Sequence, residues 1–177
     1  GAMTGPAAAG EDGKWMVKIQ ALGVLPDTKG ANVVLPNGVA AMGAPAGTVL
    51  VQQNAIIANS ILFSALDFSD PRRNKVVISD MDFPGDVYAL RQWLSPGVEL
   101  QMIRTRDGIG LDVDELLAAI DSRTRLVSLS HVLFKSAWIV PAAEIVAKAH
   151  RVGAQVLLNG YHSVGIIPVD VTALNVD

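Results

Sequence analysis

From residue 48 onward, short apolar runs alternate with longer segments in which apolar residues recur at helical spacing. The short runs have the length of buried strands and cover residues 48–51, 75–78, 98–103, 125–130 and 155–159. The longer segments are predicted to be helices and cover residues 54–66, 84–94, 112–120 and 141–152. Strands that alternate with helices predict an α/β fold, with a mainly parallel sheet and helices on both of its faces.

The ends of the predicted helices carry their own signals. Pro84 suits the first turn of a helix, because that position needs no amide hydrogen. Asp112 can cap the next helix, and Asp114 and Glu115 then lie in its electropositive first turn. Gly153 is suited to ending the last helix. These signals agree with the helices that the spacing predicts.

The first 47 residues differ in amino-acid composition from the rest of the chain. Residues 1–50 contain 9 of the 16 glycines and 4 of the 9 prolines, with few charges. We expect a tag scar at Gly1-Ala2-Met3, followed by an irregular Gly/Pro-rich arm with short strands. This arm is either free or packed on a second subunit. The chain is thus predicted to divide into the arm, residues 1–47, and an α/β domain, residues 48–177.

Composition narrows the classes of function. The 14 Lys and Arg residues against 17 Asp and Glu residues give a net charge of −3 without a basic stripe, which argues against nucleic acid as a partner. The 177 residues contain no cysteine, and so no disulfide, thiolate metal site or cysteine nucleophile, which fits a cytoplasmic protein. No apolar run reaches the roughly 20 residues of a membrane span. The mean hydropathy of +0.36 indicates a well-buried core or a large surface for a partner.

Polar and aromatic residues follow the predicted strands. Ligands of parallel sheets bind beyond the carboxyl ends of the strands, so these positions form the candidate site. Asn54 either caps a helix or leaves free amides for a phosphate. Phe83 either stacks on a flat ligand or packs before its helix. Ser130 and His131 either bind an anion or move a proton, unless backbone hydrogen bonds simply hold the histidine in place.

The densest polar cluster follows the last predicted strand, at Asn159-Gly160-Tyr161-His162-Ser163. A nucleophilic triad of Ser130, His162 and Asp86 is conceivable, but no G-x-S-x-G nucleophile elbow supports it. Three histidines without H-E-x-x-H spacing and without cysteine argue against a zinc site. The residues by themselves therefore leave the ligand open, and no metal is expected.

Four blocks of residues lie at these strand ends and in the connections between them. They are Asp82-Phe83-Pro84-Gly85-Asp86, Arg106-Asp107-Gly108 with Leu111-Asp112, Ser130-His131-Val132-Leu133-Phe134-Lys135-Ser136, and Asn159-Gly160-Tyr161-His162-Ser163-Val164-Gly165 with Pro168-Val169-Asp170-Val171. Together they resemble the kynureninase-like, class V aminotransferase family, whose members are fold-type I enzymes that use pyridoxal 5′-phosphate. The last two blocks are the most specific. The resemblance runs from about residue 48 to residue 177 and implies part of the family's large, cofactor-binding domain.

The resemblance implies a role toward this cofactor for each matching position. Asn54, Ala55 and Ile56 would lie at the phosphate of the cofactor. Phe83 would stack on its pyridine ring, and Asp86 would sit beside it. In relatives a hydroxyl residue is common at the phosphate turn, where this chain has Ile56.

Three more positions complete the implied cofactor site. Ser130 would lie near the ring and His162 near its hydroxyl face, while Asn159 stands where the family has an aspartate. The family's aspartate accepts a hydrogen bond from the protonated ring nitrogen, and the resulting cation makes the ring an electron sink. A neutral amide stabilises that cation far less well, at a cost of a few kcal/mol, roughly the value of a charge-assisted hydrogen bond.

The resemblance also implies that a reactive group is missing. In relatives the Schiff-base lysine lies on a strand shortly beyond the Pro-Val-Asp block, and here that position falls beyond Asp177. The lysines that the chain does have do not match it, and they are Lys14, Lys18, Lys29, Lys75, Lys135 and Lys148. We therefore assign no catalytic residue and interpret the chain as truncated before the Schiff-base lysine.

Three hypotheses for function remain. The first is a shortened, catalytically impaired relative, a pseudoenzyme, that acts as a binding or assembly partner in a homo- or hetero-oligomer such as a dimer. The second is an incomplete or split pyridoxal-phosphate enzyme acting on an amino acid, through C–C or C–S cleavage, elimination or transamination, with the lysine supplied by missing sequence or another chain. The third is a small domain with a new activity at Ser130, His131 and His162.

Overall fold

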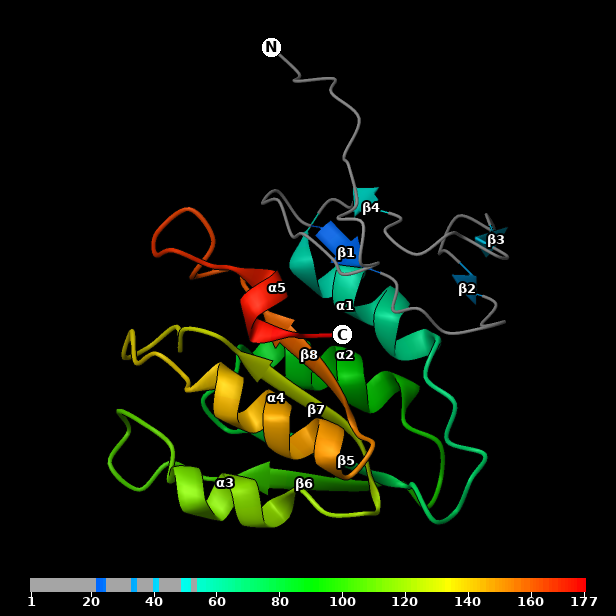
Figure 1. Ribbon diagram of the computed structural model, residues 1–177. Coiled ribbons are helices and arrows are strands. Elements are labelled where there is room, and N and C mark those ends of the chain that lie inside the picture. Colours follow the sequence, from blue (N-terminus) through cyan, green and yellow to red (C-terminus); the bar gives the residue numbers. More distant parts are fainter. Residues whose placement is uncertain (1–21, 25–32, 35–39, 42–48, 52–53) are drawn as a thin grey trace.

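The computed structural model describes residues 22–24, 33–34, 40–41, 49–51 and 54–177. A four-stranded parallel sheet lies at its centre (Figure 1). In spatial order its strands are β6 (Glu99–Ile103), β5 (Lys75–Ser79), β7 (Thr124–Ser130) and β8 (Gln155–Asn159). The parallel sheet that the alternation of elements predicts is thereby confirmed.

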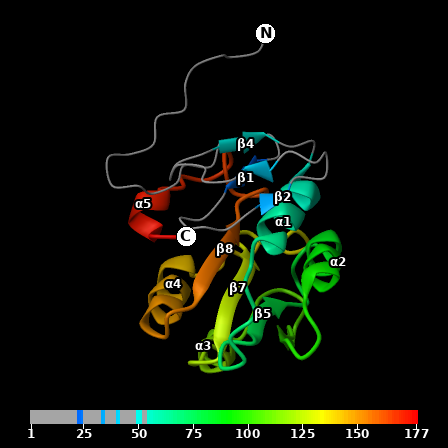
Figure 2. The ribbon, with the colours of Figure 1, turned by 90° about the vertical axis from the view of Figure 1, so that its right-hand side faces the viewer.

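Helices cover both faces of this sheet, as predicted. Figure 2 shows α2 (Pro84–Trp93) and α4 (Ala142–Arg151) on opposite sides of the strands. The helix α1 (Ala55–Ser64) packs beside α2, and α3 (Val113–Ala119) shares the face of α4. These four helices lie within two residues of their predicted bounds, while the short α5 (Val171–Leu174) was not expected from the pattern.

Each face of the sheet has its own apolar core. Val76 and Ile78 of β5 pack with Phe63 and Leu90 from α1 and α2, whereas Val77 points to the other face and packs under α3 and α4. All five residues of β5 are buried. Because both faces are covered, this strand is continuously buried instead of alternating between buried and exposed positions.

The strand predicted over residues 48–51 does not join the parallel sheet. It forms β4 (Val49–Val51), which pairs antiparallel with β1 (Leu22–Val24), so that Leu22 lies opposite Val51. This local antiparallel pairing gives the backbone groups of β4 partners outside the central sheet. Two further short strands, β2 (Val33–Val34) and β3 (Ala40–Ala41), pair in the same way. The rest of the predicted N-terminal arm lies outside the described residues.

The order of the strands creates a crevice at one edge of the sheet. From β5 the chain passes through α2 to β6, and from β7 it passes through α4 to β8 on the opposite side. The neighbours β5 and β7 are therefore the point at which the connections diverge. In open parallel sheets a crevice for ligands forms there, beyond the carboxyl ends of the strands.

The buried carboxylate of Asp82 joins the ends of these two strands. Its Oδ2 accepts hydrogen bonds from the Ser79 amide at 2.9 Å and the Ser79 hydroxyl at 2.6 Å. Its Oδ1 accepts a hydrogen bond from the Ser130 amide at 2.6 Å. Burial raises the pKa of the Asp82 carboxyl, while these hydrogen bonds act in the opposite direction. Asp82 thus fixes the distance between the ends of β5 and β7.

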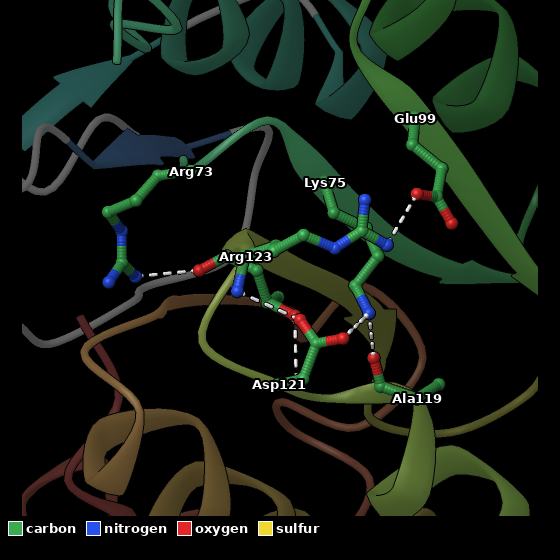
Figure 3. Close-up of polar contacts among 7 residues, drawn as sticks. Arg73, Lys75, Glu99, Ala119, Asp121 and Arg123 are labelled. Carbon is green, nitrogen blue, oxygen red and sulfur yellow. Dashed lines mark hydrogen bonds and ion pairs between the residues drawn. The ribbon is translucent and has the colours of Figure 1, made fainter. Parts of the chain in front are cut away.

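Buried charge also lies at the opposite edge, where the strands begin (Figure 3). Lys75 is only 3% exposed, and its ammonium donates to the Ala119 carbonyl at 2.6 Å and pairs with Asp121 at 2.7 Å. Close by, Arg123 pairs with Glu99 at 2.7 Å. A buried ammonium is tolerated only where such partners compensate for its lost hydration. Lys75 therefore ties the end of α3 to β5.

The first prediction concerns this contact. Burial acts to raise the pKa of Asp121, but the bonds and charges of Lys75 and Arg123 outweigh it and lower the pKa. The substitution Asp121→Asn is expected to lower the free energy of unfolding by about 1 kcal/mol, the usual net value of a hydrogen bond, since Asp121 is half exposed and partly screened. The effect is present above the usual aspartate pKa of about 3.9 and is lost as the pH falls through the lowered pKa.

Urea unfolding of the unmodified protein and of the Asp121→Asn variant at several pH values checks this prediction. The exposed Glu144, whose substitution Glu144→Gln removes the same charge, serves as the control and is expected to change stability by less than about 0.5 kcal/mol. A difference for Asp121→Asn that grows as the pH falls would contradict the assigned pairing.

The second prediction concerns the contact of Asp82 with the ends of β5 and β7. The substitution Asp82→Asn keeps the shape of the side chain but turns one acceptor into a donor, so at least one of the Ser79 and Ser130 amides loses its acceptor. We expect the free energy of unfolding to fall by about 1–3 kcal/mol, the cost of a buried unsatisfied group, measured by urea unfolding. The control is Asp67→Asn, because Asp67 is exposed and accepts one amide hydrogen, that of Ser69, which an Asn oxygen also accepts. A more stable Asp82→Asn variant would mean that burial of the charge outweighs its hydrogen bonds.

Candidate functional site

A pocket of about 320 Å³ opens at the carboxyl ends of the strands, between these ends and the first turn of α1. All eight residues that the sequence singles out line it together, although they come from four separate segments of the chain. Within the described residues, the lining consists of Asn54, Ala55, Ile56, Phe83, Asp86, Ser130, Asn159, Tyr161 and His162. Tyr161 is the one lining residue to which the sequence assigned no role of its own.

Asp86 is the single acid of the described pocket lining, it is buried, and two amides hold it. Asn59 Nδ2 donates to Asp86 Oδ1 at 2.9 Å, and Asn159 Nδ2 donates to Asp86 Oδ2 at 2.7 Å. We call Asn59, Asp86 and Asn159 the amide clamp. Burial raises the pKa of the Asp86 carboxyl, while the two amides and the nearby His162 act to lower it. The amide clamp gives each carboxylate oxygen a donor.

The orientation of Asn159 is fixed by a second contact. Its Oδ1 accepts a hydrogen bond from the Tyr161 amide at 2.9 Å, so its Nδ2 is the atom that faces Asp86. The sequence analysis did not single out Asn59 as a site residue. A polar residue within the otherwise apolar segment of α1 is a signal that could have indicated a buried polar contact. Helical position alone did not indicate that it faces an acid 27 residues away.

Aromatic rings form one side of the site. Phe83, which is 43% exposed, meets Phe134 edge to face with 5.3 Å between ring centroids. Phe134 in turn stacks with His162 at 6.5 Å and an interplanar angle of 24°, and Tyr161 meets His162 edge to face at 5.1 Å. We call Phe83, Phe134 and His162 the aromatic wall. Faces of this kind attract flat ligands with a π-system.

The first turn of α1 closes the other end of the pocket. Asn54 acts as the helix cap, because its Oδ1 accepts a hydrogen bond from the Ile57 amide at 3.0 Å. Ile56 packs against Gly85 at the start of α2, where a Cβ atom added to Gly85 would collide with Ile56 Cδ1. A larger residue at position 85 would require the Ile56 side chain to move. This end of the pocket is therefore lined by Asn54, whose side-chain oxygen is already used to cap α1, and by the apolar residues Ala55 and Ile56.

The other polar candidates occupy different positions. His131 is 7% exposed and does not line the pocket, and its Nδ1 has no hydrogen-bond partner within the described part of the chain. Its backbone bonds to Asn159 and Val140, and burial lowers the pKa of its imidazole. The carboxylate of Asp86 is held by amides at both oxygens, which differs from the contact with a histidine that a nucleophilic triad requires.

The lysines that the structure describes all lie away from the pocket lining. Lys75 is buried at the far edge of the sheet, Lys135 places its ammonium 5.5 Å from the centre of the Phe134 ring, and Lys148 belongs to α4.

Within residues 54–177 and the shorter described segments, no three metal-binding side chains gather into a site. The same residues include no helix long and apolar enough to span a membrane.

Comparison with known proteins identifies relatives of this fold and site. The chain is 28% identical to the kynureninase of Geobacillus thermodenitrificans over 141 residues, which cover 77% of this chain and 33% of that enzyme. It is 33% identical to the cysteine desulfurase of Dickeya dadantii over 123 residues, which cover 69% of this chain and 29% of that enzyme. It thus spans about a third of the length of these relatives.

Solved structures agree with this relationship. Two structures of the cystine C–S lyase C-DES, one with its product cysteine persulfide and one with glycine linked to the PLP cofactor, align with TM-scores of 0.58 and 0.59. Each alignment is 25% identical and covers 67% of this chain and 32% of the lyase. The family model of the class V aminotransferases, whose members use pyridoxal phosphate, matches residues 40–177. The chain therefore belongs to the aminotransferase class V family.

Proposed function

We propose that this chain is a catalytically impaired member of its family that acts as a binding or assembly partner. The observation that carries the proposal is the amide clamp, in which Asp86 is satisfied by two neutral amides. A site built to hold a protonated pyridine needs an acid with an oxygen directed at that cation. Two residues of this pocket stand where such an acid could lie, Asp86 and Asn159. Asn159 offers a neutral amide in place of an acid, and both oxygens of Asp86 already accept a hydrogen bond from an amide.

The residues that line the pocket fit the ring of pyridoxal phosphate better than its charged groups. When bound in family members, this cofactor supplies an electron sink for reactions at an amino acid. Phe83 offers a face for the ring, but the phosphate end of the site presents Ala55 and Ile56, which carry neither a hydroxyl nor a charge. Asn54 is committed to capping α1. A dianion placed there would be stabilised by backbone amides alone, so we derive no catalytic step through this cofactor.

Exposed apolar side chains support a role in assembly. Tyr161 is 57% exposed and Ile166 is 78% exposed on the segment that follows β8, and Tyr88 is 69% exposed on α2. Large exposed apolar residues mark surfaces that bind partners when they are grouped. Together with the mean hydropathy of +0.36, they support a cytoplasmic homo- or hetero-oligomer such as a dimer, in which the N-terminal arm contacts a second subunit.

A second candidate function rests on the pocket as a whole. The eight residues that the family resemblance selects lie around one cavity, which is the arrangement that a cofactor-binding enzyme needs. In this alternative the chain is the ring-binding part of an incomplete or split enzyme acting on an amino acid. Lysine and phosphate ligands would then come from another chain or from further sequence, and adding the missing part would restore turnover.

The third prediction distinguishes these two functions. Equilibrium dialysis against pyridoxal phosphate is expected to show weak binding to the chain, without a new absorbance band in the near-visible region. The substitution Ile56→Thr adds a hydroxyl at the phosphate end and is expected to tighten binding about tenfold, the effect of one good hydrogen bond of about 1.4 kcal/mol. Ile57→Thr makes the same change outside the pocket and serves as the control.

Tight binding by the unmodified chain, with a persistent near-visible band after dialysis, would refute the impaired function. Light scattering of the same samples tests assembly, for which we expect a mass that exceeds the 18.6 kDa of one chain. A monomer at every concentration, with no partner recovered in a complex, would count against the assembly role.

The fourth prediction concerns the charge of the amide clamp. The substitution Asn159→Asp places a second carboxylate at a position 2.7 Å from Asp86, so the pair must share a proton and its pKa rises. A raised pKa in the folded state means that stability is present at low pH and is lost as the pH rises through it. We expect the variant to be less stable by about 1–3 kcal/mol at about pH 7, and to regain most of this by about pH 4, close to the usual aspartate pKa of about 3.9.

Urea unfolding at the two pH values measures the effect. The control is Gln92→Glu, since Gln92 is exposed on α2 and its substitution adds the same charge. Equal pH dependence of the two variants would show that Asp86 does not sense position 159.

A further inference from the structure

Asn159 is followed directly by Gly160, and an asparagine in this position can react with its own backbone. A glycine has no Cβ atom, so the side chain of the preceding residue can approach the peptide nitrogen closely. The other asparagines that the structure describes precede larger residues, and they are Asn54, Asn59, Asn74 and Asn175. The Gly160 nitrogen is therefore the one most open to attack an asparagine side chain at its carbonyl carbon, Cγ.

The fold holds the Asn159 side chain in a turn over this peptide. Asn159 Oδ1 accepts a hydrogen bond from the Tyr161 amide, two residues further on, at 2.9 Å. A turn of this kind folds the side chain back over the intervening peptide, so Cγ lies toward the Gly160 nitrogen. Such proximity favours an intramolecular reaction. The Tyr161 amide also stabilises the negative charge that develops on Oδ1 when a nucleophile attacks Cγ.

The Gly160 nitrogen lies where the pairing of the sheet ends. β8 ends at Asn159, whose carbonyl accepts from the His131 amide on the side of β7. Successive residues of an extended strand direct their backbone groups to opposite sides, so the Gly160 amide points away from β7. Asn159 and Gly160 are both half-buried, and Asn159 lines the pocket, so water reaches the pair.

We propose that Asn159 is a site of spontaneous modification, at which the folded chain converts this asparagine to aspartate or isoaspartate. The Gly160 nitrogen attacks Asn159 Cγ and forms a C–N bond, and the bond between Cγ and Nδ2 breaks. Nδ2 leaves as ammonia with the proton that the Gly160 nitrogen gives up, and a cyclic imide remains. Water then opens the imide. Addition of water at Cγ gives aspartate, and addition at the main-chain carbonyl carbon gives isoaspartate.

The loop before α3 contains the same turn without the reactive amide. Asp107 precedes Gly108, and its Oδ1 accepts from the Ile109 amide, two residues further on, at 2.8 Å. The hydrogen bonds from the Ile109 and Gly110 amides lower the pKa of the Asp107 carboxyl, so this group is an anion at neutral pH. An anionic carboxylate resists attack by a nucleophile and has no good leaving group. Asp107 therefore matches Asn159 in its backbone and differs in its side-chain group.

Conversion breaks the amide clamp. Asn159 Nδ2 donates to Asp86 Oδ2 at 2.7 Å, and this donor is lost with the ammonia. Aspartate places a second carboxylate against Asp86, so the two acids compete for one proton. Isoaspartate instead inserts Cβ into the main chain between β8 and Tyr161, which displaces Tyr161 and His162 from the pocket lining. The pocket thus changes with the age of the protein.

Peptide mapping by mass spectrometry tests this proposal on the full chain, incubated in mildly alkaline buffer. Conversion replaces an amide by an acid and changes the peptide mass, and methylation by an isoaspartyl methyltransferase marks the isoaspartate. The control is Asn74, which is also half-buried and donates its amide to a carbonyl, that of Gly97, but precedes Lys75. We expect conversion at Asn159 to be at least about tenfold faster than at Asn74, which corresponds to about 1.4 kcal/mol in the barrier.

Two comparisons show whether the turn and the amide are both required. Urea removes the turn, so we expect conversion at Asn159 to be no faster in urea than in the folded chain. Isoaspartate at Asp107 is expected to form at least about tenfold more slowly than at Asn159. The Asn159→Asp variant supplies one product directly, and chains converted to aspartate are expected to share its unfolding midpoint.

The outcomes that overturn the proposal are distinct from those that bear on the proposed function. The sequence contains a second Asn-Gly pair, Asn37-Gly38. Absence of conversion at Asn159 in samples in which Asn37 has been converted would overturn the proposal. Conversion at Asn159 that is much slower in the folded chain than in urea would also overturn it, because the fold would then protect the pair. Neither result affects the impaired function, which is decided by the binding of pyridoxal phosphate to freshly prepared chain.

Discussion

The carboxylate of Asp82 holds the ends of β5 and β7 together, and the geometry of the pocket depends on this contact. The two strands are the ones at which the connections of the sheet diverge, and their backbone pairing runs to Val77 and Val127, short of their carboxyl ends. Asp82 accepts from Ser79 on one strand and Ser130 on the other. Because Phe83 follows Asp82 directly, and Ser130 itself lines the pocket, one buried carboxylate positions residues on both sides of the site.

Two buried acids only four residues apart are stabilised in different ways. Asp82 is held by backbone amides and by the hydroxyl group of Ser79, so its role is structural. Asp86 is held by the side-chain amides of Asn59 and Asn159, which come from α1 and the end of β8. Because both amides are neutral, Asp86 is the single acid of the described lining and sets the charge that the pocket presents to a ligand.

The opposite edge of the sheet needs charged residues for another reason. Arg73 donates to the carbonyls of Thr124, Val152 and Gly153, where α4 ends and β7 begins, and Lys75 does the same for Ala119 at the end of α3. Carbonyls at helix ends lack intrahelical partners and carry partial negative charge. Cations at this edge satisfy them, so the buried Lys75 has a structural partner and lies far from the ligand pocket.

The sequence by itself determined the helices and the four parallel strands, because hydrophobic period and capping residues act over a few positions. The eight candidate site residues followed from the resemblance of the sequence to a known family. The sequence did not determine where β4 pairs, since three extended residues have no preference of their own for a parallel or an antiparallel neighbour. Only the tertiary structure decided that Asn59 and Asn159, which lie 27 and 73 positions from Asp86, meet at its two oxygens. It likewise placed Phe134 between Phe83 and His162. Such contacts depend on how distant segments of the chain pack against one another, and the local spacing of residues carries no information about that packing.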